Sequence, residues 1–409
     1  RAQLVQSAQH VQLVWRRRLG GVRRNVEVWD QILMVRSMVL TPTEDAESWI
    51  KMASLCRKSG KLRLSENILS NLLCQQEGVA EGAAEDRRRQ SVYAECHLDL
   101  EDVLQMRNAD PRTTYAFLKH VWESGNQEDA FRGMKRFVLM VEGGRSGDVG
   151  GLAEDPSGAT ALLARCYLKL GQWQREILDW SAPKVPDKEE VSVVIESFRS
   201  AIQLENKWHK AWHWWALVNF DVVNQTEMAR VAGASTSSSS SSALPPAASS
   251  GTPAATGQVA DASSEEISRR DAAVSAAVQG FFQAIAHGNG ANLQNTLRLL
   301  TLWFKFAGSI PELEATLSKG FDTISIDTWL QVIPQILARI HSPSFVVRRL
   351  ILQLLSAVGK KHPQALVYPL TVAAKSQHMG RVSAAKSIMK TMQQHSATLV
   401  EQAELVSVE

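Results

Sequence analysis

Residues 326–340 read IDTWLQVIPQILARI, and they decide the fold because their apolar side chains recur at helical spacing. A turn at His341-Ser342-Pro343 follows, and a second apolar helix is expected over residues 346–355. Residues 360–370 lead into a third apolar run, which a proline again introduces. The apolar stripe of each helix is too broad for a helix that stands alone, so each must pack on neighbours. The stretch predicts a helical-repeat scaffold and not a catalytic pocket.

Similar helical pairs are expected throughout the chain. A helix that Thr41 caps and Pro42 opens is expected to run to about Lys58, and a second helix over residues 64–73 returns after a glycine turn. Residues 191–204 and 207–223 form another predicted pair. The best copy of this tetratricopeptide-like pattern, ALLARCYLKLGQW, spans residues 161–173. The copies are unevenly spaced, and no segment alternates as a strand would. The predicted fold class is therefore all-α, an irregular α-solenoid of tetratricopeptide-like and then HEAT-like helical hairpins.

A change of composition divides the chain. Residues 232–265 are rich in serine, alanine and proline, with unbroken serines from 237 to 242. Such a segment cannot bury a core, so we expect a disordered linker there. It separates predicted tetratricopeptide-like repeats over residues 1–231 from predicted HEAT-like repeats over residues 266–409.

Length and composition limit the class of protein. Of the 409 residues, 44% are hydrophobic and 21% charged, and the net charge of +3 is too small to indicate nucleic-acid or membrane binding by itself. No apolar run approaches the ~20 residues of a membrane span. The four cysteines form no Cys-x-x-Cys pair, which favours reduced thiols over a disulfide or metal framework. The sequence begins at Arg1 and stops within a helical pattern, so we expect a fragment of a longer protein.

The motifs of common enzymes are missing from the sequence. There is no kinase catalytic loop with its metal-binding motif, no Gly-x-Ser-x-Gly elbow and no His-Glu-x-x-His zinc motif. The glycine-rich residues 143–151 lack the Lys-Ser/Thr of a phosphate loop, and a flexible loop is expected there. His209 and His213 lie four residues apart, but a third metal ligand is not evident, so packing is the better interpretation. We expect no catalytic residue and no metal site in this chain.

Two clusters allow a functional interpretation beside a structural one. Trp208, Trp212 and Trp215 share one helical face, which indicates core, although aromatic rings beside lysines could also stack on a ring-shaped ligand. Because no basic stripe continues from them, nucleic acid is not expected. Five arginines between residues 16 and 24 are either a solvated helix face or a patch for an anion or an acidic partner.

Several blocks of sequence, in the same order as in a known family, carry a resemblance to that family. Residues 326–335, together with HPQALVYPLTVA at residues 362–373, resemble the FAT region of phosphatidylinositol-3-kinase-related protein kinases, and in particular of target of rapamycin (TOR) kinases. The supporting blocks are residues 32–37, 53–56, 164–171, 210–213, 278–282, 292–298 and 300–304. The resemblance implies a C-shaped α-solenoid that clamps a kinase domain, with the rapamycin-binding bundle and the catalytic lobes following it.

The resemblance also implies a function and partners. The chain would be the regulatory scaffold of a Ser/Thr protein kinase in nutrient and growth signalling, with ATP and magnesium used only in the kinase domain that follows. Its partners would be its own C-terminal kinase domain and TOR complex subunits, in a dimeric parent protein. The expected location is the cytoplasm, including endomembrane surfaces reached through partners, or the nucleus. The alternative is a free-standing helical-repeat adaptor that binds proteins on its concave face, and the third hypothesis is an enzyme.

The resemblance finally implies a site for an inositol polyphosphate such as inositol hexakisphosphate. Lys119 and Lys210 match positions of that basic pocket, and Lys207 is a neighbouring candidate. The alternative is that these three lysines are solvent-exposed helix ends. The sequence departs from the more basic family pattern at four other positions, Glu123, Asn126, Gln127 and Asn206.

Overall fold

The computed structural model describes residues 13–77, 96–106, 108–144, 156–178, 187–237, 255–288 and 292–408. Over these ranges every regular element is a helix, which confirms the predicted all-α class. The chain forms two compact units, Arg1–Asp179 and Trp180–Glu409, and each is described by itself. The glycine-rich residues 145–151 of the predicted loop lie outside the described ranges.

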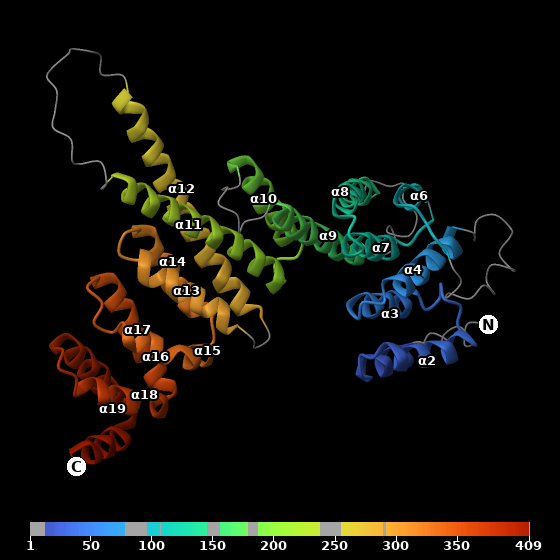
Figure 1. The fold of residues 1–409 in the computed structure, drawn as a ribbon. Helices are drawn as coiled ribbons and strands as arrows, with labels where there is room; N and C mark the ends of the chain where they lie inside the picture. The colour runs from blue at the N-terminus through green and yellow to red at the C-terminus, as the bar shows by residue number, and fades with distance from the viewer. Residues whose placement is uncertain are drawn as a thin grey trace. The chain divides into compact units, whose positions relative to one another are not determined.

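The first unit consists of helical hairpins (Figure 1). After a short helix over residues 13–21 come α2 (Val26–Ser37), α3 (Ala46–Lys58), α4 (Leu62–Glu77), α6 (Leu100–Gln105), α7 (Pro111–Glu123), α8 (Gln127–Gly144) and α9 (Pro156–Ile177).

Glycine turns separate the helices of two hairpins in the first unit. α3 ends before Gly60, whose φ of +76° is a backbone conformation that glycine adopts at little cost, and α4 then returns along α3. Gly125, with a φ of +107°, makes the same reversal between α7 and α8. α7 begins at Pro111, where the Asp110 carboxylate accepts a hydrogen bond from the backbone N–H of Arg112. The predicted pair is present as α3 and α4, but the predicted start at Thr41-Pro42 is wrong, because residues 42–45 form turns and α3 begins at Ala46.

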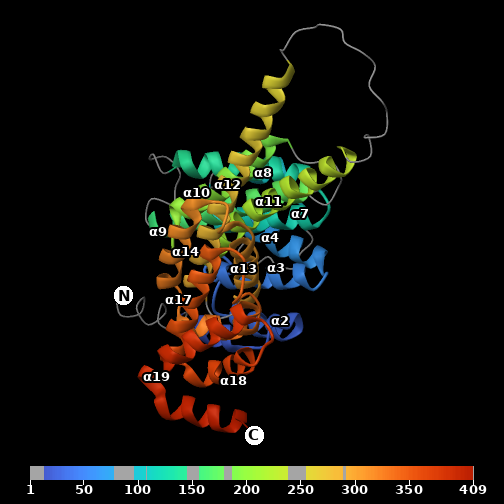
Figure 2. The ribbon, with the colours of Figure 1, turned by 90° about the vertical axis from the view of Figure 1, so that its left-hand side faces the viewer.

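The second unit contains the longest helices and the largest core. Its elements are α10 (Lys188–Leu204), α11 (His209–Ser237), α12 (Ala255–Ala286), α13 (Leu293–Phe306), α14 (Pro311–Thr323), α15 (Ile326–Trp329), η2 (Leu330–Val332), α16 (Ile333–Ala338), α17 (Phe345–Lys361), α18 (Pro363–Ala374) and α19 (Met379–Val408). α11 and α12 lie side by side in both views (Figures 1 and 2). One continuous apolar core runs from Val191 in α10 to Val400 in α19.

The stretch 326–340 is less regular than one helix. It forms α15, the short 3₁₀ segment η2 and α16, because Pro334 has no N–H to continue an α-helix and its ring excludes the carbonyl four residues earlier. Trp329 is 0% exposed, and its ring meets that of Phe321 edge-on at 5.5 Å between centroids. Trp329 is therefore a packing residue, as predicted.

One acidic residue ties this stretch to the turn between α17 and α18. The Asp327 carboxylate accepts a hydrogen bond from Lys361 Nζ at 3.1 Å and lies 2.6 Å from His362 Nε2. Hydrogen bonds from Lys361, Ser325 and His362 lower the pKa of Asp327 to about 2. The two family blocks, residues 326–335 and 362–373, thus meet in the folded chain.

The predicted linker, residues 232–265, is helical at both of its ends. α11 continues to Ser237 and α12 begins at Ala255, since backbone hydrogen bonds extend a long helix past its last packed side chain. Residues 238–254 lie outside the described ranges. No helix among the described residues is long and apolar enough to cross a membrane.

Candidate anion-binding site

The predicted site residue Lys119 lies in a cluster of basic side chains from three helices of the first unit. α7 carries Lys119, α3 carries Arg57, and α9 carries Arg165 and Lys169 one turn apart. Lys119 is half-buried, and its Nζ lies 4.3 Å from the ring centroid of Tyr115, one turn earlier on α7. The Tyr115 hydroxyl donates a hydrogen bond at 3.4 Å to the backbone carbonyl of Arg165, which joins α7 to α9.

Burial and mutual repulsion destabilise the charges of this cluster. The pKa of Lys119 is lowered to about 8, chiefly by burial and then by the positive charges of Arg57, Lys169 and Arg165. The pKa of Lys169 is also lowered, by burial and by Arg57, although Glu176 opposes this. Burial likewise raises the pKa of the Cys166 thiol to about 12.

Few carboxylates compensate these cations. Arg57 pairs with Glu123 at the end of α7, and the Arg57 side chain is 8% exposed. Among the described residues, neither Lys119 nor Lys169 has a carboxylate oxygen within the 4.0 Å of an ion pair. A charged acceptor between these two half-buried ammonium groups would satisfy their donors and relieve their repulsion, which makes the cluster a candidate anion site.

The other two predicted lysines lie elsewhere in the chain. Lys207, in the turn before α11, and Lys210, in the first turn of α11, are exposed in the second unit, whereas Lys119 belongs to the first. Within one unit, Lys119 is instead joined by Arg57, Arg165 and Lys169. The sequence contained one signal for the missed residues, since Arg165 and Lys169 are four apart in the best repeat copy, residues 161–173.

The tryptophan-rich start of α11 is largely packing. Trp215 is 9% exposed, and the Trp212 indole donates a hydrogen bond to the Asn206 carbonyl at 2.6 Å. His213 Nδ1 lies 2.8 Å from the side-chain oxygen of Asn295 in α13, so its ring is engaged. In the described ranges, no three His, Cys, Asp or Glu side chains are grouped as metal ligands.

The helical hairpins of the described residues define the class of the protein, an all-α helical-repeat protein. The family model of the FAT domain matches residues 3–301, and that of the HEAT repeats of ATR-like Ser/Thr-protein kinases matches residues 312–407. The chain belongs to the FAT domain family, and its resemblance to TOR kinases is confirmed.

The chain is similar to Ser/Thr-protein kinase TOR2 of Saccharomyces cerevisiae, with 37% identity over 97% of this chain and 15% of that protein. It is 38% identical to the kinase mTor of Drosophila melanogaster, over 97% of this chain and 14% of that protein. A solved structure described as the FAT and kinase domain of CtTel1 has a TM-score of 0.50 at 11% identity, over 88% of this chain and 24% of that one. The chain thus spans about a seventh of the curated relatives named here.

Proposed function

We propose that this chain is the regulatory helical scaffold of a TOR-type Ser/Thr protein kinase, and that it holds the kinase domain of its parent in position. Membership of the FAT family and similarity to TOR kinases over 97% of the chain support the proposal. The proposal includes TOR complex subunits as partners, a dimeric parent and action in the cytoplasm in nutrient and growth signalling.

One observation carries this proposal, an uncovered apolar face near the carboxyl end of the second unit. Tyr368 and Val372 lie four residues apart on α18 and are 75% and 55% exposed. With Leu399 and Ala403 of α19 they line a hollow of about 430 Å³. Exposed apolar side chains that gather around a hollow are typical of a docking surface. Tyr368 also lies in the family block 362–373, so we assign this face to the kinase domain.

The test is binding of this chain to the separately expressed kinase domain of a TOR kinase, measured by calorimetry. Tyr368→Glu with Val372→Glu should weaken binding at least about tenfold, since two charges would be buried against apolar surface. Leu139→Glu is the matched control, because Leu139 is 68% exposed on α8, outside this face. Equal affinity of the double variant and the control would contradict the proposed role of this face.

We also propose that the cluster of Lys119, Lys169, Arg57 and Arg165 binds an inositol polyphosphate. The supporting observation is the lowered pKa of Lys119, whose causes include three neighbouring cations. A compact polyanion can accept hydrogen bonds from several of these groups at once. Lys207 and Lys210, which belong to the second unit, are proposed separately as ligands of an inositol polyphosphate, and their exposure leaves them accessible.

Inositol hexakisphosphate should raise the melting temperature. At a ligand concentration a hundredfold above Kd, binding adds about 2.7 kcal/mol to the free energy of unfolding. Lys119→Ala and Lys169→Ala should each weaken binding, whereas Lys135→Ala on α8 should not, because Lys135 is not among the cations that act on Lys119. If Lys207→Ala and Lys210→Ala have no effect while Lys119→Ala does, the site is confined to the first unit. An unchanged melting temperature at saturating ligand would exclude the site.

This site should also depend on pH in a predictable direction. Only the protonated ammonium of Lys119 binds an anion well, and its pKa in the free protein is lowered to about 8. Affinity for inositol hexakisphosphate should therefore fall as pH rises through about 8, and Lys119→Arg should remove that step because arginine stays charged. Calorimetric titrations between about pH 7 and 9 measure this change.

A further inference from the structure

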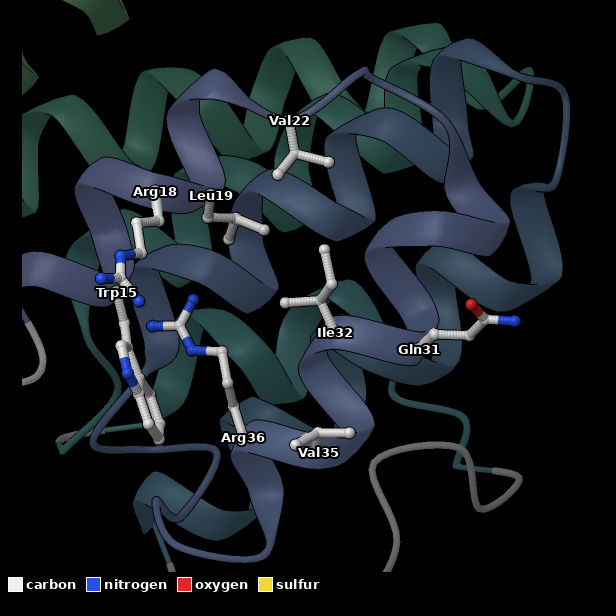
Figure 3. Close-up of a pocket in the computed structure, with 8 residues that line it drawn as sticks. All are labelled: Trp15, Arg18, Leu19, Val22, Gln31, Ile32, Val35 and Arg36. Atoms are coloured by element: carbon white, nitrogen blue, oxygen red, sulfur yellow. The ribbon is translucent and has the colours of Figure 1, made fainter.

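A groove at the start of the first unit has apolar walls and a basic rim (Figure 3). Trp15, Leu19 and Val22 form one wall, and Ile32 and Val35 of α2 form the other. The hollow measures about 420 Å³, within the range of small-molecule and side-chain pockets. The residues of each wall are three or four positions apart, so the groove runs between two helices.

The apolar surface continues beyond the groove along α2 and the residues after it. Val35 is 62% exposed, and its neighbours Met34, Met38 and Val39 are 50%, 81% and 71% exposed. A contiguous exposed patch of this kind is unusual for a surface that faces only water. The methionines add an adaptable surface, which suits recognition of a partner's apolar side chains.

The helix that forms the first wall, and the residues just after it, carry positive charges without counter-charges. Arg17, Arg18, Arg23 and Arg24 are exposed, and among the described residues none of them is within ion-pair distance of a carboxylate. Arg16 is the exception in this cluster, since its guanidinium lies 3.1 Å from Glu47. Arg18 itself lines the groove (Figure 3). The sequence left open whether this cluster is a solvated face or a patch for an acidic partner, and the place of Arg18 beside apolar walls favours the partner.

We propose that this groove binds an amphipathic α-helix of a partner protein whose apolar face is flanked by acidic residues. The apolar side chains of such a helix would enter between Leu19 and Val35, and one of its carboxylates would meet Arg18. A helix fits because the walls are themselves helices, which is the geometry of helix-in-groove recognition. Strand addition is disfavoured because the described part of the chain offers no sheet edge.

The test uses the whole 409-residue chain and a synthetic helical peptide of about 18 residues, with leucines at i, i+4 and i+7 and glutamates on both flanks. Fluorescence anisotropy of the labelled peptide measures Kd. A second peptide keeps the leucines and replaces the glutamates with lysines. We expect the glutamate peptide to bind at least about tenfold more tightly, and its affinity to fall with salt.

Two variants and two controls test the position of the site. Val35→Glu and Arg18→Glu should each weaken binding at least about fivefold, through an introduced charge on the wall and through reversed charge on the rim. Leu139→Glu and Arg63→Glu, at exposed positions on α8 and α4, should leave Kd unchanged. Because Val35 is exposed, its substitution should not unfold the chain, and an unchanged circular dichroism melting curve confirms this.

Several results would overturn the proposal. One is equal binding of the lysine peptide, and another is binding that Val35→Glu leaves intact. Another is self-association of the chain that is lost in Val35→Glu and that the peptide does not inhibit. This result would assign the groove to a second copy of the chain. If the chain does not bind the peptide but floats with phosphatidylserine vesicles, and Val35→Glu abolishes this flotation, the groove would be assigned to a membrane surface.

Discussion

At the scale of the residue, Arg36 and Asp45 form a buried ion pair. Arg36 is 5% exposed and Asp45 is 3% exposed, and Arg36 Nη2 lies 2.9 Å from Asp45 Oδ2. Ser48 Oγ donates a further hydrogen bond at 2.7 Å to Asp45 Oδ1. Burial raises the pKa of Asp45, while Ser48 and Arg36 oppose that shift. The pair joins α2 to the first turn of α3, so it also supports one wall of the groove.

Arg36→Ala should lower the free energy of unfolding by about 3–5 kcal/mol at neutral pH, because it leaves the Asp45 carboxylate buried and unpaired. Because the pKa of Asp45 is raised, at pH values between its unfolded and folded pKa the folded state binds a proton that the unfolded state has lost. The contribution of Asp45 to stability is therefore greatest at acidic pH and decreases as pH rises through the folded pKa. The loss of stability caused by Arg36→Ala should shrink at low pH, where Asp45 is protonated. Urea unfolding at several pH values measures it.

Lys51→Ala is the control for this prediction. It breaks an exposed pair, in which Lys51 Nζ lies 2.7 Å from Glu47 Oε1, and should change stability by less than about 1 kcal/mol. A cost of Arg36→Ala that is as small as this, or that does not depend on pH, would mean that the buried charge is relieved by solvent.

At the scale of the element, the contact between α11 and α12 depends on a glycine. A Cβ built on Gly280 would lie 2.8 Å from the Cβ of Ala216 and 2.9 Å from the ring of Trp215. It would also lie 3.2 Å from the backbone Cα of Ala216, which cannot turn away as a side chain can. Gly280 therefore sets how closely these two helices pack.

Gly280→Ala should lower the melting temperature of the second unit, because overpacking costs about 1–3 kcal/mol and outweighs the gain in helix propensity. Gly380→Ala in α19 is the matched control, since its Cβ would have its nearest neighbour at 3.9 Å. Differential scanning calorimetry of the two variants measures the difference. A higher melting temperature for Gly280→Ala than for Gly380→Ala would show that the helices separate without cost.

At the scale of the whole molecule, the two units have separate cores. One core cluster lies between Leu19 and Phe117, and the other lies between Val191 and Val400. Since a unit with its own core can fold alone, residues 187–408 expressed by themselves should be helical and unfold cooperatively. Circular dichroism during heating tests this, and gradual loss of signal without a transition would contradict it. Residues 13–178 are the companion fragment for the same measurement.

The local sequence determined the helices. Apolar periodicity, glycine turns such as Gly60 and N-terminal prolines such as Pro111 act over a few residues, so the all-α class, the helical pairs and the family resemblance could be predicted from it. A break near Pro334 could be predicted, because the missing N–H of proline is a local property. The division of the stretch into α15, η2 and α16 could not be predicted.

Only the tertiary structure decided which charges meet. Lys119 was predicted as a site residue, yet its partners Arg57, Arg165 and Lys169 come from helices α3 and α9, far away in the sequence. Likewise, the sequence did not show that Arg18 lies beside an apolar groove, because α2 supplies the second wall of that groove. Burial and Coulomb interaction depend on distance in space, and the spacing of residues along a chain specifies that distance only within one helix.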